Sequence, residues 1–516
     1  MAPPRAEEEA LAAGADLSAT PSNDDASPGE DEQPVGPVAA KIGSEYESSH
    51  GEAAPDEEKY PPVFQDWPKP LLTLYFTGRQ HGYIEPCGCT GLANQKGGLS
   101  RRHVLLKKLA EQGWNPVPID VGNQVRRFGR QPEIKFQTTV AGLKKIGYQA
   151  IGFGPDDLRL SSGELLSAAL GTDGTPAPFV CANVNLLGQT PTLRVIEAGG
   201  KKIGVTAILG REEQRSVSSD EIELSDPDTA LEKVVPKLEA EKCDLYVLLA
   251  HTSIEESKRL GKKFPLFDLV VTAGSAGEPS NRLEPIEGSK GRLVQIGAKG
   301  MYVSVVGVFD DAETPLRLQR TPLDGRYGDS SDMLDLMASY QQQLEAVGLE
   351  GLGVRPLDHP SGHKFVGSAA CADCHEREYD IWKNSPHAHA TDAIVHPKER
   401  GHIQRHFDPE CLSCHVTGWN PQEHHPWRSG YLNLDESKKL TQSGCENCHG
   451  PGSAHAAAEN GEIDGLTDAQ IEQLREGMRL KLSEARDTCL KCHDLDNSPN
   501  FHLPGAFEEY WKRIAH

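Results

Sequence analysis

Two periodicities of hydrophobic residues alternate along the chain from residue 70 to about residue 323. Short runs rich in β-branched and aromatic residues predict strands, and segments with apolar residues three and four positions apart predict amphipathic helices. Strands that alternate with helices are typical of an α/β sandwich. The predicted strands cover residues 71–77, 116–119, 149–153, 179–184, 203–208, 244–250, 267–272, 292–296 and 302–308, and the predicted helices cover 99–112, 133–146, 162–170 and 228–241.

A separate helix is predicted over residues 332–348, followed by a hinge over residues 351–363 that contains three glycines and two prolines. Because one apolar stripe runs along this helix, we expect it to dock on the α/β domain as a connector. A contact between two copies of the chain is the alternative. The stripe consists of Met333, Met337, Tyr340, Leu344 and Val347.

Residues 364–516 contain few apolar runs and almost no strand signals. Helices are predicted at residues 377–384 and 467–485, and Thr467 with Gln470 can form a capping box at the start of the second. We therefore predict a mostly helical and irregular domain with little regular β structure. Such a segment needs bound apolar groups to complete its core.

Acidic residues are concentrated at the start of the chain. Residues 1–60 carry 15 Asp/Glu and 3 Lys/Arg, a net charge of −12 out of −23 for all 516 residues. This composition predicts a disordered tail, which can tether the folded part to a membrane, and the acidity argues against a nucleic-acid partner. No apolar run reaches the roughly 20 residues of a membrane helix. The predicted division is a tail over 1–69, an α/β domain over 70–325, a connector over 326–363 and a C-terminal domain over 364–516.

The pattern Cys-x-x-Cys-His occurs four times in the C-terminal domain and uses eight of the 12 cysteines. Two thiols at this spacing attach to the two vinyl groups of one haem, and the histidine that follows becomes an axial ligand of the iron. The sequence therefore predicts four covalently bound haem c groups. The copies are Cys371/Cys374/His375, Cys411/Cys414/His415, Cys445/Cys448/His449 and Cys489/Cys492/His493.

Histidines are also concentrated in this region, since 16 of the 20 lie after residue 350. Four haems with two axial imidazoles each need eight, so every iron can be ligated on both sides. Ligation on both sides suits electron transfer, whereas a five-coordinate iron leaves a position for a small molecule. This surplus of histidines favours an electron carrier over a haem enzyme.

The sequence segments between the motifs resemble those of the cytochrome c-554 family over about the last 150 residues. They include residues 365–368 before the first motif, 382–390 after it, 444–455 around the third and 510–516 at the end. The resemblance implies closely packed haems, mostly with two imidazole ligands and sometimes with one five-coordinate iron. It gives His387 and His455 as distal ligands and His516 as a weaker candidate. His389, His363, His402 and His406 are expected at the surface or on propionates, and His424 and His425 in solvent.

Residues 71–310 resemble the calcineurin-type metallophosphoesterases of the 5'-nucleotidase branch, whose fold is an α/β sandwich with two metal ions held in loops. Segments 71–82, 97–102, 119–122, 147–150 and 179–184 follow the order of that family. Most of the ligand positions that the resemblance assigns are altered, although His81 and His251 remain. The altered positions are Arg79 in place of Asp, Asn123 in place of the bridging Asp, Pro155 and Asp156 in place of Asn-His, and Ser275 and Gly277 in place of two histidines.

A two-metal phosphoesterase needs both ions, so we expect the domain to be inactive as a hydrolase and to serve as a scaffold or docking module. Cys87 and Cys89 lie in the loop after the first strand. They can form a redox-active disulfide or a soft-metal site, and a structural disulfide or packed thiols are equal alternatives. Cys181 and Cys243 are expected as buried core thiols.

These patterns predict an exported multihaem c-type cytochrome that exchanges electrons with redox partner proteins. Haem c is attached outside the cytoplasm, so a periplasmic or other extracytoplasmic location is expected. Residues 1–9 show no export signal, which we expect to lie outside the given sequence or to have been removed. One alternative is an oxidoreductase acting on a small nitrogen, oxygen or sulfur compound at a five-coordinate haem or at Cys87/Cys89. Another is an active phosphohydrolase fused to a cytochrome.

Overall fold

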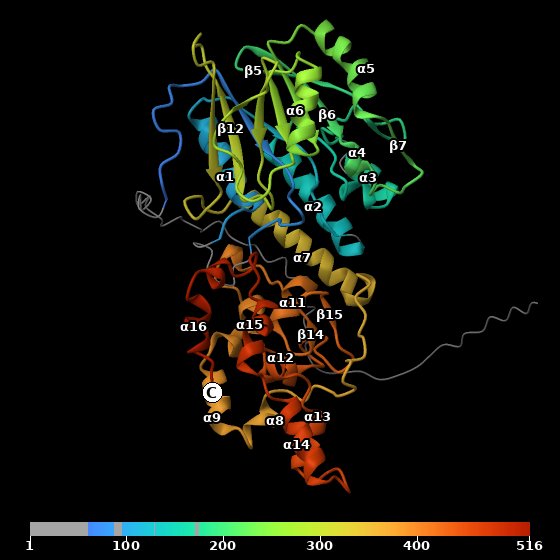
Figure 1. Cartoon of the computed structure of the whole chain (residues 1–516), viewed down its shortest axis with the longest axis vertical. Coiled ribbons are helices and arrows are strands. Elements are labelled where there is room, and N and C mark those ends of the chain that lie inside the picture. Colours follow the sequence, from blue (N-terminus) through green and yellow to red (C-terminus); the bar gives the residue numbers. More distant parts are fainter. Residues whose placement is uncertain (1–59, 87–94, 128, 171–174) are drawn as a thin grey trace, which may run out of the picture. The chain divides into compact units, whose positions relative to one another are not determined.

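The computed structural model describes residues 60–86, 95–127, 129–170 and 175–516 (Figure 1). All of them belong to one compact unit of the chain. Within these ranges, no helix is both long enough and apolar enough to cross a membrane.

Two mixed β-sheets form the first half of this unit. In the first sheet, β1 pairs in parallel with β2 and antiparallel with β12, and in the second β6, β8, β9 and β11 run parallel. The first sheet has the order β13 (Leu316–Pro322), β12 (Tyr302–Val308), β1 (Leu72–Thr77), β2 (Pro116–Asp120) and β3 (Ala150–Ile151). The second has the order β10 (Glu284–Pro285), β11 (Arg292–Gln295), β9 (Leu269–Thr272), β8 (Leu245–His251), β6 (Lys201–Leu209) and β5 (Arg194–Ala198).

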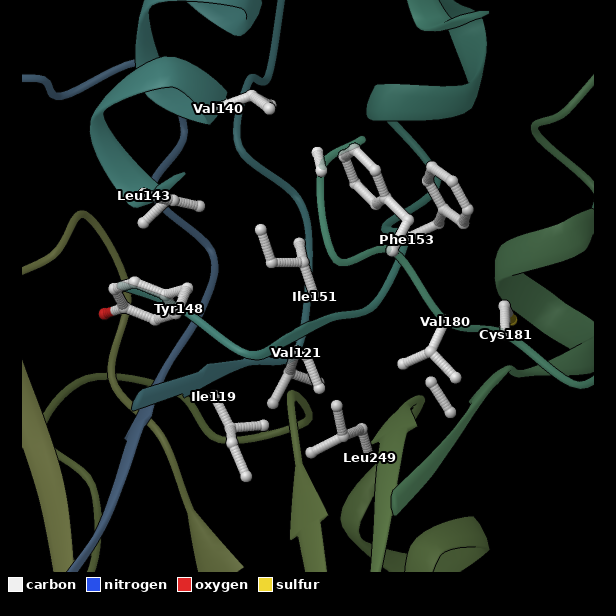
Figure 2. Close-up of a cluster of buried hydrophobic side chains, with 14 of the residues drawn as sticks. Ile119, Val121, Val140, Leu143, Tyr148, Ile151, Phe153, Val180, Cys181 and Leu249 are labelled. Carbon is white, nitrogen blue, oxygen red and sulfur yellow. The ribbon is translucent and has the colours of Figure 1, made fainter. Parts of the chain in front are cut away.

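The main core lies between the two sheets, where both contribute buried aliphatic side chains. Figure 2 shows Ile119, Val121 and Leu249 gathered in this core. All six residues of β1 are buried, because helices cover the outer faces and leave the strand no exposed side. The covering helices are α1 (Leu99–Glu111), which packs on the first sheet, and α5 (Pro227–Ala240) and α6 (Ile254–Lys263), which pack on the second (Figure 1). The predicted α/β sandwich is therefore confirmed.

The connector helix α7 (Ser331–Gly351) packs against α1 and against α2 (Arg130–Ile146). Met333, Met337, Tyr340 and Leu344 are buried in the main core, and Val347 packs against its edge. The expectation that this helix docks on the α/β domain is confirmed. The helix continues three residues beyond the predicted end, and its backbone is kinked at Gly348.

The C-terminal region consists mostly of short helices with one two-stranded pair, as predicted. Its small apolar cluster centres on Phe365, Leu412, Trp419 and Tyr431. The helices are α8 (Ala369–Ala372), α9 (Glu376–Lys383), α10 (Ala390–Val395), α11 (Pro409–His415), α12 (Cys445–His449), α13 (Ser453–Glu459), α14 (Asp468–Gly477), α15 (Leu482–Leu490) and α16 (Ala506–Trp511), and the strands are β14 (Trp419–Asn420) and β15 (His425–Pro426).

Two of the predicted elements need correction, and some elements were not predicted. The strand expected over residues 179–184 is reduced to a bridge at Phe179, and β4 (Val184–Leu186) begins only after it, because the Asn183 amide bonds the backbone of neighbouring segments. The helix expected over residues 467–485 is two helices, since the chain leaves α14 at Met478. Strands β5 and β13 and helix α6 were not predicted.

Charged side chains join the α/β half to the C-terminal region. Arg405 Nε and Nη2 donate to the two carboxylate oxygens of Glu85 at 2.5 and 3.0 Å, and Arg400 Nη1 lies 3.0 Å from the same carboxylate. Lys135 Nζ donates to Glu410 at 2.6 Å. Burial opposes ionisation of Glu85, yet the two arginines hold its pKa below the ordinary value.

The variant Glu85→Gln should therefore lower the free energy of unfolding by about 2–3 kcal/mol, because it leaves two largely buried guanidinium groups without a counter-charge. The stabilisation is present above the ordinary pKa of glutamate and is lost as pH falls through the lowered folded pKa. Denaturant unfolding at pH 7 measures the change. Glu212→Gln, at a highly exposed pair with Arg215, is the control, and an equal effect in both variants would contradict this account.

Candidate functional site

One cavity of about 1870 Å³ dominates the C-terminal region. All eight motif cysteines and all four motif histidines line it, together with the candidate distal ligands His387, His455 and His516. The four motifs, spread over more than 120 residues of sequence, therefore face a common space.

Each motif forms one helical turn. The second lies within α11, the third forms α12, and in the first and fourth the amide of the histidine donates to the carbonyl of the first cysteine at 2.9 and 2.8 Å. In a helical turn, positions i, i+3 and i+4 lie on the same face. Both thiols and the imidazole of each motif therefore point to one side, which is the arrangement that attachment of a single haem requires.

Hydrogen bonds fix the orientation of three motif imidazoles. His415 Nδ1 lies 2.5 Å from Ala390 O, His449 Nδ1 lies 2.7 Å from Met478 O, and His493 Nδ1 lies 3.0 Å from Ser498 Oγ. A carbonyl oxygen can only accept, so in His415 and His449 the proton is on Nδ1. The ring lone pair is therefore on Nε2, as in a metal-binding histidine.

Three histidine pairs face each other across the cavity. The ring centres of His375 and His455 are 6.3 Å apart. Those of His387 and His493 are 6.1 Å apart, and those of His449 and His516 are 5.7 Å apart. Two imidazoles on opposite sides of one metal ion have ring centres roughly 6 Å apart, since each metal–nitrogen bond is about 2 Å. Each pair can therefore hold one iron.

The cysteines of different motifs meet in the cavity. The thiols of Cys371 and Cys445 form a hydrogen bond, which raises the pKa of Cys371 and lowers that of Cys445 to about 7. A similar bond joins Cys414 to Cys492 and raises the pKa of Cys414. Burial, assisted by the neighbouring Cys489, raises the pKa of Cys448 to about 11. Motif one thus adjoins motif three, motif four adjoins motif two, and Cys489 of motif four lies near enough to Cys448 of motif three to affect its pKa.

The remaining histidines differ in their environment. His389 lines the cavity, but its side chain is 69% exposed. His424 and His425 are not in solvent as expected, because both are half-buried and His424 Nδ1 lies 3.0 Å from Ser413 Oγ, beside the second motif. Burial lowers the pKa of His424 to about 4.

Glu446, between the cysteines of the third motif, is a site residue that the sequence did not reveal. Its buried carboxylate accepts hydrogen bonds from the amides of Val366, Gly367 and Gly452 at 2.8–3.1 Å. Burial raises its pKa despite these bonds. The side chain thereby fixes the segment before the first motif to the third motif.

The α/β half supplies part of the cavity wall, including Tyr83, Lys135 and Tyr340. Tyr83 donates to Asp496 Oδ2 at 2.6 Å, and Lys299 pairs with the same carboxylate. Asp496 lies three residues after the motif histidine His493. The loop after β1 therefore contacts the segment that follows the fourth motif.

The positions of the altered metal site come together at the carboxyl ends of β1, β2, β3, β8 and β9. Asn123 Nδ2 donates to Asp156 Oδ2 at 2.9 Å, and Arg79 Nη1 donates to Ser275 O. Arg79, His81 and Asn123 have φ values of 51°, 55° and 67°, a costly backbone conformation for residues other than glycine. The site is thus assembled, with a guanidinium where the resemblance places a metal-binding carboxylate.

Both remaining histidines of this site are uncharged at neutral pH. Burial and the nearby Arg79 and Arg126 lower the pKa of His81 to about 3. Burial, opposed by a hydrogen bond to Val121 O and assisted by Arg79, lowers the pKa of His251 to about 4.

The other cysteines add no further site. Cys87 and Cys89 lie outside the described residues, so the proposals made for them stay predictions. Cys181 is buried, as expected, and burial raises its pKa to about 11. Cys243 is half-buried rather than a core residue.

Comparison with known proteins gives matches to each half of the chain. Residues 370–450 match the family model of cytochrome c554 and c-prime. Cytochrome c-554 of Nitrosomonas europaea is 31% identical over 97 residues, covering 17% of this chain and 39% of that protein. An apyrase of Aedes albopictus is 20% identical over 303 residues, covering 52% of this chain and 54% of that protein.

Among solved structures, a 5'-nucleotidase precursor from Thermus thermophilus is similar with a TM-score of 0.46 and 21% identity, covering 54% of this chain and 59% of that one. The chain spans about half or less of the length of the curated relatives it matches. The resemblance of the C-terminal region to the cytochrome c-554 family, predicted from the sequence, is confirmed. The cytochrome match supports haem c as the cofactor of the C-terminal region and electron transfer as its role.

The lowered pKa values of His81 and His251 predict that acidification destabilises the α/β domain. Between the folded pKa values and the ordinary value near 6.5, the unfolded chain binds more protons than the folded chain. The free energy of unfolding therefore decreases as the pH is lowered through this range. The slope is at most about 1.4 kcal/mol per pH unit for each histidine. Denaturant unfolding followed by tryptophan fluorescence from pH 6.5 to 5 measures it. Trp67 and Trp114 report on the α/β half, and the other four tryptophans lie after residue 380.

In this experiment His251→Gln should give a shallower slope than the wild type, and Arg215→Gln should leave the slope unchanged. A slope that stays the same in both His251→Gln and His81→Gln would contradict the assignment of these histidines as neutral in the folded protein.

Proposed function

We propose that the chain is an exported multihaem c-type cytochrome that carries electrons on four haem c groups attached to residues 364–516. The observation that carries this proposal is the set of three facing imidazole pairs in a cavity lined by all four Cys-x-x-Cys-His motifs. Bound haem c supplies reversible one-electron transfer.

The cysteines of each motif are the attachment points and the motif histidines are the proximal ligands. Of the three candidates for distal ligands, His455 serves the first motif, His516 the third and His387 the fourth, because these are the rings that face His375, His449 and His493. The Nδ1 hydrogen bonds of His415 and His449 to carbonyl oxygens hold these two imidazoles in the tautomer that a ligand needs.

The proposed order of the motifs is one, three, four, two. Thiol hydrogen bonds join motif one to motif three and motif four to motif two, and Cys489 of motif four affects the pKa of Cys448 of motif three. Neighbouring attachment sites therefore follow one line through the cavity. Its two ends, at the first and second motifs, are the positions where redox partner proteins would exchange electrons with the chain.

The α/β domain acts in this proposal as a scaffold without phosphohydrolase activity. It closes part of the cavity wall with Tyr83 and Lys135, and the connector helix α7 adds Tyr340. Ion pairs of Glu85 with Arg405 and of Lys135 with Glu410 join the α/β domain to the C-terminal region. A periplasmic location follows from the chemistry, because haem c is attached outside the cytoplasm.

Replacing a distal ligand tests the assignment. His455→Ala should convert one haem from a six-coordinate low-spin to a high-spin state, which electron paramagnetic resonance and the optical spectrum detect. His389→Ala is the matched control, because His389 lines the same cavity but is largely exposed. Spectra of His455→Ala identical to the wild type would refute the pairing of His455 with His375.

The scaffold role predicts no metal-dependent hydrolysis. The purified holoprotein, assayed with AMP and with a phosphodiester in the presence of Mn²⁺, Mg²⁺ or Zn²⁺, should release no more phosphate than the buffer. Arg79 and Asn123 remove the negative charge that would hold two divalent ions. Turnover that depends on added metal, and that His251→Gln abolishes, would show that the domain is an active enzyme.

A further inference from the structure

His455, whose ring faces His375, has a buried nitrogen that lacks a hydrogen-bond partner. This nitrogen is Nδ1, and it bonds no other atom of the described residues. When Nε2 binds a metal, Nδ1 carries the proton and can only donate. A buried donor left without an acceptor is costly, so the protein around this ring should supply one.

One carboxylate lies next to this nitrogen. Glu459 is four residues after His455 in α13, and residues at this spacing share one face of a helix. The distance from Glu459 Oε1 to His455 Nδ1 is 3.8 Å, and both side chains line the cavity. This distance is too long for a hydrogen bond. A side-chain shift of about 1 Å would bring the two atoms to the distance of a charge-assisted hydrogen bond.

Arg475 of α14 holds this carboxylate in place. Its Nε donates to Glu459 Oε1 at 2.6 Å, and its Nη2 donates to Oε2 at 2.9 Å. These bonds keep the pKa of Glu459 below its ordinary value. Each carboxylate oxygen has two acceptor positions, so Oε1 can accept from Arg475 and His455 together. Glu459 therefore presents an ionised acceptor to the ring.

The other two distal candidates have different surroundings. His516 Nδ1 lies 3.0 Å from the carbonyl oxygen of Ile514, which is a neutral acceptor. Within the described ranges, neither His516 nor His387 has a carboxylate at ion-pair distance. Of these three rings, His455 is therefore the one that the described part of the chain places beside a carboxylate.

We propose that Glu459 is a positioning residue for His455, which accepts a hydrogen bond from Nδ1 and lowers the reduction potential at the first motif. The proposal rests on the assignment of His455 as the distal ligand of that motif. A carboxylate that accepts from a ligand imidazole fixes the orientation of the ring and makes it a stronger electron donor. A stronger donor favours oxidised iron over reduced iron.

Arg475 limits this effect, because its hydrogen bonds draw electron density of the carboxylate towards the guanidinium. Without Arg475, the carboxylate of Glu459 would be a stronger acceptor. The first motif lies at one end of the proposed order of motifs. A lower potential there favours transfer of one electron from the first motif, which is oxidised, to the third, which is reduced. Glu459 thereby favours one direction of electron flow at this end.

Redox titration of the holoprotein at pH 7, followed by optical absorbance and electron paramagnetic resonance, tests the proposal. Glu459→Gln should raise the potential of one haem, because a neutral amide is a weaker acceptor than a carboxylate. A roughly tenfold loss of preference for oxidised over reduced iron corresponds to about 59 mV for a one-electron couple. The g values of one low-spin signal should shift with it. Arg475→Gln should move the same potential in the opposite direction.

Glu472→Gln is the matched control. Glu472 accepts from Arg475 Nη1 at 3.3 Å, so this variant removes the same charge from the same arginine without a change beside His455. It should leave the g values of that signal unchanged. Pyridine haemochrome absorbance shows whether each variant binds as many haems as the wild type.

Unchanged g values in Glu459→Gln, or equal potential shifts in Glu459→Gln and Glu472→Gln, would overturn the proposal. Arg475 is about half exposed, so its variant provides a test even if Glu459→Gln does not mature, and unchanged potentials in Arg475→Gln would also overturn the proposal. Failure of the ligand assignment would appear elsewhere, as a wild-type spectrum of His455→Ala. The two failures can therefore be told apart.

Discussion

The C-terminal region depends on one physical constraint, which is the space between facing imidazoles. Pairs of rings whose centres lie about 6 Å apart do not hydrogen-bond to each other, and they lie in one cavity of about 1870 Å³. The backbone nevertheless positions the rings firmly, by helical turns and by the Nδ1 bonds of His449 and His493. A metal-centred apolar group would fit this arrangement, because the facing imidazoles would hold its metal and its apolar part would occupy the cavity.

The α/β domain contributes to this arrangement through one loop. The segment after β1 carries Arg79 and His81 on one side and Tyr83 and Glu85 on the other. The first two belong to the altered metal site, and the second two contact the C-terminal region. Loss of metal ligands in this loop is compatible with its second role, because Tyr83 and Glu85 make their contacts without a metal ion. The same loop therefore links the altered metal site to the wall of the cavity.

The sequence was most informative where chemistry demands a fixed local spacing. Cys-x-x-Cys-His specifies one helical turn, so the motifs could be found without a structure, and the alternation of apolar runs predicted the sandwich. The sequence segments around His387 and His455 gave these two histidines as candidate distal ligands, and in the structure each ring lies about 6 Å from the ring of a motif histidine. Interactions between distant segments could not be predicted in this way. Neither the bonds from Glu446 to residues 366 and 367 nor the contact of Tyr83 with Asp496 leaves a periodic signal. The burial of His424 was missed for the same reason.

The haem content of the purified chain tests the central claim most directly. Pyridine haemochrome absorbance per mole of chain, together with the mass of the intact denatured protein, counts the covalently attached haems. This account predicts four haems per chain, which remain attached on denaturation because thioether bonds hold them. Fewer than four in fully matured protein, or haem that dissociates on denaturation, would contradict it.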